Sequence, residues 1–311
     1  MSAPDPTSGG SPVGVLVGPT ASGKTALAVE LARRLGDVEI ISMDSMVVYR
    51  GMDVGTATPT PAERAAVPHH LVDVVDPAED HTVAAHQALV AAALADIDGR
   101  GRRALLVGGT GLYVRAVVDR LRIPPRYPEV RAELEAQPDT VSLHRRLAEL
   151  DAAAAARMEP TNRRRVVRAL EVTIGSGVPF SEHGPGLEHY PDLAWPIVGL
   201  DVPRDVLDIR IAARYRRQLA AGFVDEVRVL SARPGGLSAT ARQALGYREL
   251  LEHVEDGAPL DACVEVAVRR TRRFARRQQR WFRRDPRIRW VAAPDPDDPA
   301  LLDAVRLALG W

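Results

Sequence analysis

Residues 18–25, GPTASGKT, are the stretch of this sequence whose residue types and spacing point most directly to chemistry. The pattern G-x-x-x-x-G-K-[ST], with a strand-like run before it and a helix-like run after it, is typical of a phosphate-binding loop. In such a loop, backbone N–H groups at a helix N-terminus surround an oxyanion, and the hydroxyl of Thr25 can ligate Mg²⁺. We therefore predict a phosphate site formed by Gly18, Pro19, Thr20, Ala21, Ser22, Gly23, Lys24 and Thr25.

Lys24 is the only lysine in a chain with 41 lysine and arginine residues in total. A lysine ammonium is a compact point charge, whereas the planar guanidinium of arginine does not fit a cradle sized for one such charge. The chain otherwise uses arginine for every basic position, so we interpret Lys24 as a residue that the phosphate site requires.

An acid that would activate water is not evident beside this loop. P-loop proteins that hydrolyse ATP usually place an acid at the end of a neighbouring strand. Here the run ALLVGG leads into Thr110 without an acid. Asp73 and Asp76 could replace it, and the neighbouring His69 and His70 lack a third metal ligand at suitable spacing. The sequence therefore offers few residues that could activate a water molecule beside this loop.

Asp44 and Ser45 follow the strand-like run VEIIS directly. At the carboxyl end of a strand, beside the phosphate loop, a carboxylate can accept a proton from an incoming nucleophile. The alternative is structural, because Asp-Ser is also favourable at the N-cap of a helix. Sequence chemistry leaves both interpretations open.

These residues depend on a core in which short apolar runs alternate with helical segments. Such alternation predicts parallel βαβ units, whose ligands bind at the carboxyl ends of the strands. The strand-like runs are residues 13–18, 38–42, 70–75, 104–109 and 195–202. We expect an α/β fold, with a P-loop-type parallel sheet flanked by helices.

Proline-rich RIPPRYP, residues 122–128, ends the alternation, and helical patterns follow it. We therefore predict an all-helical insertion at residues 126–190 within a core formed by residues 12–125 and 191–311. The C-terminal part of that core reads as mostly helical. Residues 1–11 are small, polar and proline-containing, and we expect a disordered lead-in there.

Composition and charge narrow the function classes. The formal net charge is zero, but residues 268–289 carry eleven arginines and one acid, which predicts a basic surface. Cys263 reads as a small core residue. No signal peptide or membrane span is visible, so we expect a cytoplasmic protein.

Helical spacing places one set of residues from the arginine-rich segment on a common core-facing side: Val264, Ala267, Thr271, Phe274, Gln278 and Trp281.

The sequence resembles the tRNA dimethylallyltransferase family along nearly its whole length. The blocks that carry this resemblance are GPTASGKT, DSMVVYRGMDVGTATP, PHHLVDVVDP, LLVGGTGLYVRAVV, PEVRAEL, RRRVVRALEV, ARYRRQLAAGFVDEV, QALGYREL and TRRFARRQQRWFRRD. Their order and spacing match the family. The combination is far more specific than the phosphate loop alone.

The resemblance implies that the loop holds dimethylallyl diphosphate, with Mg²⁺ as cofactor. The dimethylallyl group would pass to N6 of the adenosine next to the anticodon, position 37, in tRNAs that read U-initial codons. By position in the family, Asp44 is the general base and Thr110 assists it. Lys24 and Arg214 stabilise the departing diphosphate, and Arg210 is a less favoured alternative to Arg214.

The resemblance also implies contacts with the anticodon stem-loop of tRNA, made by a protein expected to be monomeric. By family position, the contacting residues are Asp44, Ser45, Met46, Val47, Thr110, Arg131, Arg164, Arg165, Val166, Val167, Arg168, Gln243, Ala244, Leu245, Gly246, Tyr247 and Arg248. The insertion arginines could instead form a solvated helix face.

Three other functions compete with this one. A small-molecule kinase would also use a phosphate loop, but it would leave the arginine-rich insertion and QALGYR without a role. A prenyl transferase acting on free adenylate would not need the insertion. A non-catalytic nucleic-acid-binding module would not need Lys24 and Asp44.

Overall fold

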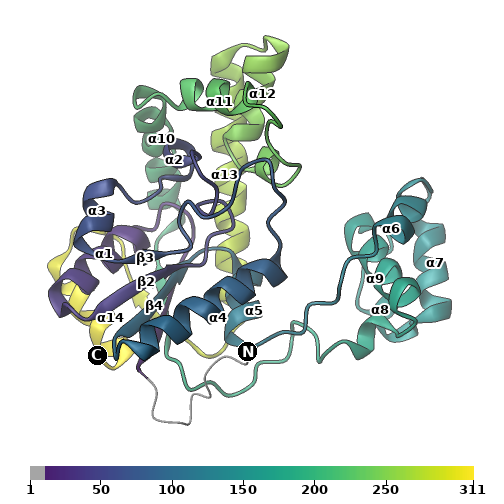
Figure 1. The fold of residues 1–311 in the computed structure, drawn as a ribbon, viewed down its shortest axis with the longest axis horizontal. Helices are drawn as coiled ribbons and strands as arrows, with labels where there is room; N and C mark the ends of the chain where they lie inside the picture. Colours follow the sequence, from purple (N-terminus) through teal and green to yellow (C-terminus); the bar gives the residue numbers. More distant parts are fainter. Residues whose placement is uncertain (1–10) are drawn as a thin grey trace. The chain divides into compact units, whose positions relative to one another are not determined.

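The computed structural model describes residues 11–311, which divide into two compact units (Figure 1). The larger unit combines the chain up to Val118 with Asp192–Trp311, and the smaller unit is Asp119–Pro191. The sequence had placed the helical insertion at residues 126–190.

The predicted lead-in, residues 1–11, lies outside the described part of the chain except for its last residue. The backbone N–H of Ser11 donates to Oδ1 of Asp98 at 2.6 Å. Within residues 11–311, no helix has both the length and the apolar character needed to cross a membrane.

The larger unit contains one sheet of six parallel strands in the order β3-β2-β4-β1-β5-β6. This confirms the predicted α/β class. Because all the strands run in one direction, their carboxyl ends meet at a single edge of the sheet. The strands are β1 (Val13–Val17), β2 (Val38–Ser42), β3 (His69–His70), β4 (Arg103–Gly108), β5 (Ile197–Asp201) and β6 (Ile288–Ala292).

Two strands differ from the sequence prediction. The expected strand at residues 70–75 is reduced to His69–His70, because Leu71 and Asp73 adopt left-handed backbone angles, with φ of 61° and 55°. Such residues cannot continue an extended strand. The edge strand β6 was not predicted, since it lies within a C-terminal region that reads as mostly helical.

The two faces of the sheet are covered by different helices. Helices α1 (Lys24–Leu35) and α14 (Pro299–Leu309) pack on one face, where Leu16 points. Helices α4 (Val83–Gly99) and α5 (Gly111–Val118) pack on the other, where Val15 and Val17 point. Side chains along a strand alternate between its faces, so the apolar run of β1 is buried on both sides.

A third apolar cluster lies among helices that follow the strands. Its largest fully buried side chains are Tyr49, Phe223 and Tyr247, and the rings of the last two pack edge to face at 4.9 Å. The cluster is drawn mostly from α10, α11, α12 and α13, and from residues that follow β2. The bounds of the helices are α2 (Asp53–Thr56), α3 (Pro61–Ala66), α10 (Arg204–Ala220), α11 (Phe223–Ser231), α12 (Tyr247–Asp256) and α13 (Leu260–Phe282).

The smaller unit is helical and has an apolar core of its own. At one side of this core lies the fully buried carboxylate of Glu171. It accepts hydrogen bonds from the backbone N–H of Tyr127 at 2.9 Å, from Arg131 at 3.2 Å and from Arg168 at 2.8 Å. A buried charge requires such partners. The helices are α6 (Pro128–Glu135), α7 (Thr140–Leu150), α8 (Ala152–Ala156) and α9 (Arg163–Ser176).

Candidate active site

The phosphate loop joins β1 to α1 and has the backbone conformation of an anion cradle. Ala21 and Gly23 have φ of 63° and 89°, and no side chain caps the N-terminus of α1. A left-handed alanine is strained, and strain of this kind occurs at functional sites. The first backbone N–H groups of a helix lack partners within it, so an uncapped N-terminus favours an anion.

The hydroxyl groups of the loop differ in their surroundings. Ser22 is fully buried, and its Oγ has no hydrogen-bond partner among residues 11–311. Thr25, the second residue of α1, is exposed. An unpaired buried hydroxyl is unfavourable unless a ligand satisfies it, which fits a site made for an oxyanion.

The ammonium of Lys24 turns back over the loop and donates to the carbonyl oxygen of Pro19 at 3.2 Å. Burial lowers the pKa of Lys24 to about 8, and the nearby Arg214 lowers it further, while Asp44 opposes both effects. These three predicted catalytic residues are therefore close enough to act on one another. Desolvation and a neighbouring cation disfavour a charged ammonium, so a bound anion would stabilise it.

Asp44 follows β2 at the carboxyl edge of the sheet. Its Oδ1 accepts from the backbone N–H of Met46 at 2.8 Å, and its other carboxylate oxygen accepts no hydrogen bond from the described residues. No helix begins here, since the next one starts at Asp53. The helix N-cap interpretation is therefore wrong: Asp44 forms a side-chain turn that leaves one oxygen available.

Thr110 lies at the end of the neighbouring strand. β2 and β4 are adjacent, and the backbone N–H of Met43 donates to the carbonyl of Val107 at 2.8 Å. A Cβ on Gly108 would lie 2.7 Å from the backbone of Met43, so only glycine permits this approach. The structure thus brings Asp44 and Thr110 to adjacent strand ends, although they are distant in sequence.

Arg214 comes from α10 and is held by backbone carbonyl groups. It donates to Gly55 at 3.2 Å and to Thr56 at 2.9 Å. Burial lowers the pKa of its guanidinium, whereas Tyr215 and Asp44 raise it. Arg210, the alternative, instead donates to the carbonyl of Pro294 at 2.8 Å. Of the two arginines, Arg214 is the one that interacts electrostatically with Asp44 and Lys24.

The carbonyl groups that hold Arg214 belong to α2, which Glu226 and Gln218 fix in place. Glu226 accepts from the backbone N–H groups of Asp53, Val54 and Gly55 at 2.7–3.0 Å. The amide of Gln218 donates to the carbonyl groups of Val54 and Gly55 at 2.7 and 2.8 Å. Because this carboxylate caps so short a helix, the sequence alone does not reveal its role.

The two acids considered as water activators are committed elsewhere. Asp73 pairs with Arg64 at 2.6 Å, and Asp76 pairs with Arg233 at 3.0 Å. His70 bonds to Glu39 at 2.7 Å. Within residues 11–311, no three His, Cys, Asp or Glu side chains are grouped to hold a metal.

Gln278 is a site residue whose role the sequence did not indicate. The helical spacing predicts that it lies on the core-facing side of the arginine-rich helix, and it is buried there. Its amide, however, bonds to the backbone of Thr20 in the phosphate loop and of Gly109 beside Thr110. The available signal was a polar residue on a face that is otherwise mostly apolar.

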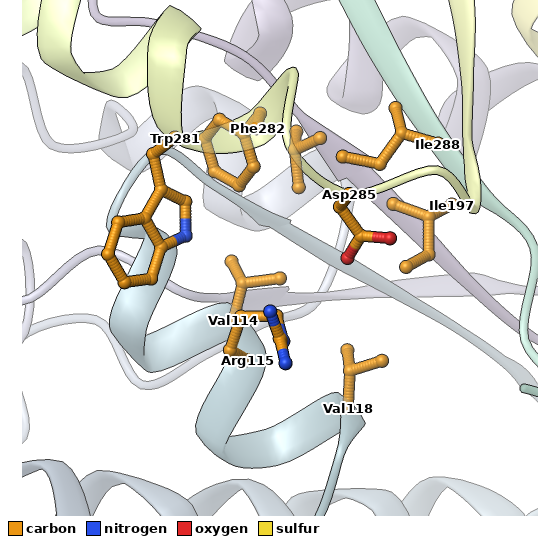
Figure 2. A pocket seen from close by; sticks show the side chains of 9 residues that line it. Val114, Arg115, Val118, Ile197, Trp281, Phe282, Asp285 and Ile288 are labelled. Carbon is orange, nitrogen blue, oxygen red and sulfur yellow. The ribbon is translucent and has the colours of Figure 1, made fainter. Parts of the chain in front are cut away.

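A small pocket lies between α5 and the end of α13. Figure 2 shows Trp281, Phe282 and Asp285 on one side of it and Val114 and Val118 on the other. Its volume is about 10 Å³, about what one water molecule requires. It is a packing gap, too small for a substrate.

The predicted tRNA-contacting residues fall into two groups. Arg164, Arg165, Gln243 and Arg248 are exposed, and Ser45, Met46, Leu245, Arg131 and Arg168 are partly exposed. In contrast, the side chains of Val47, Val166, Val167, Ala244 and Tyr247 are buried, as is Gly246. Ala244 and Tyr247 belong to an apolar cluster of the larger unit, and Val166 and Val167 to the core of the smaller one.

The insertion arginines also differ among themselves. Arg131 and Arg168 bind Glu171 and support the small core. The side chains of Arg164 and Arg165 form no hydrogen bond or ion pair with any described residue. Of the four insertion arginines predicted to contact tRNA, these two are therefore the ones whose side chains are available to an external phosphate.

Comparison with known proteins identifies the family of this chain. The sequence profile described as IPP transferase matches residues 47–285. A relative from Kineococcus radiotolerans, named tRNA dimethylallyltransferase, is 50% identical over 306 residues, covering 96% of this chain and 95% of the relative.

Solved structures with the same fold include two bacterial proteins. The tRNA isopentenylpyrophosphate transferase of Bacillus halodurans has a TM-score of 0.69 and 37% identity, covering 96% of this chain and 97% of its own. The corresponding transferase of Staphylococcus epidermidis has a TM-score of 0.68 and 30% identity, covering 96% and 99%. Since the profile and these near full-length relatives agree, the chain belongs to the IPP transferase family.

Proposed function

We propose that this protein is a tRNA dimethylallyltransferase. It transfers the dimethylallyl group of dimethylallyl diphosphate to N6 of the adenosine at position 37 in tRNAs that read U-initial codons, and diphosphate is released. The observation that carries this proposal is the convergence of Lys24, Arg214 and Asp44 at the phosphate loop. Two cations face a leaving group there, and a carboxylate faces the acceptor.

The donor side must stabilise charge that develops as the allylic C–O bond breaks. The electron pair of that bond leaves with the diphosphate. Lys24, Arg214 and the uncapped N-terminus of α1 are fixed donors around this position. Preorganised groups of this kind stabilise a transition state without having to reorient.

The acceptor side must activate a weak nucleophile. The lone pair of an exocyclic aromatic amine is delocalised, so a carboxylate bonded to its N–H raises the electron density on nitrogen. The free oxygen of Asp44 accepts that hydrogen bond and takes the proton as the C–N bond forms. Thr110, at the adjacent strand end, assists in holding the amine. The base leaves its stack to reach this position.

Mg²⁺ is the proposed cofactor, and it would neutralise charge on the diphosphate. The exposed hydroxyl of Thr25 at the start of α1 would be its protein ligand. Mg²⁺ commonly retains water molecules and binds substrate phosphate oxygens together with only one or two protein groups. A single protein ligand, the hydroxyl of Thr25, is consistent with this mode of Mg²⁺ binding. We expect a cytoplasmic monomer, in keeping with a tRNA substrate.

The direct test is to incubate the protein with dimethylallyl diphosphate, Mg²⁺ and an unmodified tRNA that reads U-initial codons. We expect isopentenyl-adenosine in nuclease digests of the tRNA, detected by mass spectrometry. Free AMP in place of tRNA tests the adenylate alternative, and ATP with small-molecule acceptors tests the kinase alternative. Phosphoryl transfer without any prenylated tRNA would refute the proposal.

Asp44→Asn separates proton acceptance from the structural role of this residue. The amide oxygen still accepts from the N–H of Met46, but it cannot take a proton from N6. We expect the single-turnover rate to fall roughly 10²-fold or more, with little change in tRNA affinity. The matched control is Ser42→Ala, which removes the 3.3 Å bond to the N–H of Asp44. If Asp44→Asn kept more than a third of the rate, Asp44 would not be the base.

The pKa of Lys24 predicts how donor capture depends on pH. Because this pKa is lowered to about 8 in the free protein, the ammonium is charged below that pH and neutral above it. We expect kcat/KM for dimethylallyl diphosphate to fall as pH rises from 7 to 9.5, because this ratio reports the free enzyme. Lys24→Arg keeps its charge, so its kcat/KM should be lower but show no such decline. A decline shared by both proteins would assign the titration to another group.

Arg164→Ala/Arg165→Ala tests the RNA-binding role of two exposed arginines of α9 whose side chains have no partner among the described residues. Each phosphate contact releases counterions, so we expect weaker tRNA binding and a plot of log Kd against log salt that is shallower by about 1 to 2 units. The control is Arg146→Ala, an exposed arginine of α7 in the same unit. An equal effect of the control on the slope would contradict a specific role.

A further inference from the structure

We propose that Gln278 is a positioning residue that sets the spacing between the phosphate loop and the turn that carries Thr110. This inference rests on the proposed function, since it concerns how the prenyl donor and its acceptor are aligned. Gln278 belongs to α13, more than 250 residues from the loop, and it is 6% exposed.

The side-chain amide of Gln278 is used at both ends. Its Oε1 accepts from the backbone N–H of Thr20 at 2.9 Å, and its Nε2 donates to the carbonyl oxygen of Gly109 at 2.7 Å. Thr20 lies within the predicted diphosphate site, and Gly109 immediately precedes Thr110. One rigid planar group therefore connects the donor-binding segment to the acceptor-binding segment.

This connection begins where the sheet stops. The last paired residues of β1 and β4 are Val17 and Gly108, and the chain beyond them has no ladder hydrogen bonds to hold the two segments together. Both functional segments start just after this point. Gln278 thus extends the cross-link between β1 and β4 beyond the end of the ladder.

Close packing shows that the contact is tight. A Cβ on Gly109 would lie 2.6 Å from Nε2 of Gln278 and 2.9 Å from the carbonyl oxygen of Gly18. A Cβ on Gly111 would lie 2.2 Å from Trp281, one turn further along α13. The helix therefore contacts the backbone on both sides of Thr110, and neither glycine can carry a side chain without a shift.

The alignment has a chemical purpose. A C–N bond forms efficiently when the reacting atoms are held at about 3–3.5 Å with the correct orientation, and a displacement of about 1 Å can lower the rate about 10²-fold. Only an amide supplies both a donor and an acceptor here. A carboxylate would keep the bond from Thr20 but could not donate to Gly109, and a methionine would lose both bonds.

Gln279 offers a matched control. It is the next residue on the same helix and is 8% exposed, and its amide donates to the carbonyl oxygen of Val202 at 2.9 Å. Val202 is outside all the predicted site segments. Gln278→Met and Gln279→Met each remove a buried amide from α13, so they carry a similar general cost to stability.

The first measurement is the single-turnover rate of prenyl transfer with saturating enzyme. For Gln278→Met we expect a fall of about 10- to 100-fold, with affinities for dimethylallyl diphosphate and tRNA changed by less than about 3-fold. For Gln279→Met we expect a rate within about 2-fold of the wild type. Gln278→Glu, which keeps the bond from Thr20, serves as a second variant should Gln278→Met fail to fold, and its rate should also fall. Equal loss in the Gln278 and Gln279 variants, or a loss confined to affinity, would overturn the inference.

Hydrogen–deuterium exchange tests the positioning without any reaction. Gln278→Met should speed exchange of amides within residues 18–25 and 109–112, and Gln279→Met should leave both segments unchanged. If wild-type protein makes no prenylated tRNA, the proposed function fails, while the exchange result still decides whether Gln278 holds the two segments. If the wild type is active and Gln278→Met alters neither the rate nor the exchange, only the role of Gln278 is refuted.

Discussion

Two cations and one carboxylate lie close together at the carboxyl edge of the sheet, and burial makes their charges costly. The desolvated ammonium of Lys24 is destabilised by Arg214 and stabilised by Asp44. The three groups leave an excess of one positive charge in surroundings partly shielded from water. An anionic ligand would compensate this excess, so the electrostatic cost of the cluster favours binding of the proposed diphosphate.

Each member of this charge cluster is held by the backbone, so its position depends on the wider fold. Arg214 rests on carbonyl groups of α2, a helix that Gln218 of α10 and Glu226 of α11 hold in place. Asp44 uses one oxygen to bind the backbone of Met46. Supports of this kind leave side chains few alternative rotamers, which is what preorganised catalysis requires. The apolar cluster around Tyr49, Phe223 and Tyr247 stabilises the whole arrangement.

The smaller unit shows that residues of one type in one helix can have unrelated roles. Arg168 pairs with the buried carboxylate of Glu171, and its removal would leave that charge less compensated. Arg164 and Arg165, within one turn of it, point away from the core of the unit and are exposed. Arg164 and Arg165 precede Arg168 by four and three positions, so all three lie on neighbouring parts of the helix surface, but only Arg168 pairs with Glu171. Structural support and the proposed RNA binding are thus assigned to nearby residues of one helix.

The sequence by itself determined the phosphate loop, the parallel α/β class and the family resemblance, because each is encoded in local spacing. A glycine pattern before a helix, or an apolar run of strand length, has the same meaning wherever the chain places it. It also pointed to Asp44 but left a helix cap and a general base both open; the backbone excludes the cap, since no helix begins there, and the role of base stays a proposal.

Contacts between distant segments were decided only by the tertiary structure. It placed Arg214 near Lys24 and Asp44 and bound Arg210 to the carbonyl of Pro294 instead, paired Asp73 and Asp76 with arginines, and buried Tyr247 and Val166. It also placed Gln278 between Thr20 and Gly109, a relation that no local pattern encodes. In each case, side chains from separate elements compete for the same buried space and the same unpaired backbone groups. That competition exists only once the chain has folded.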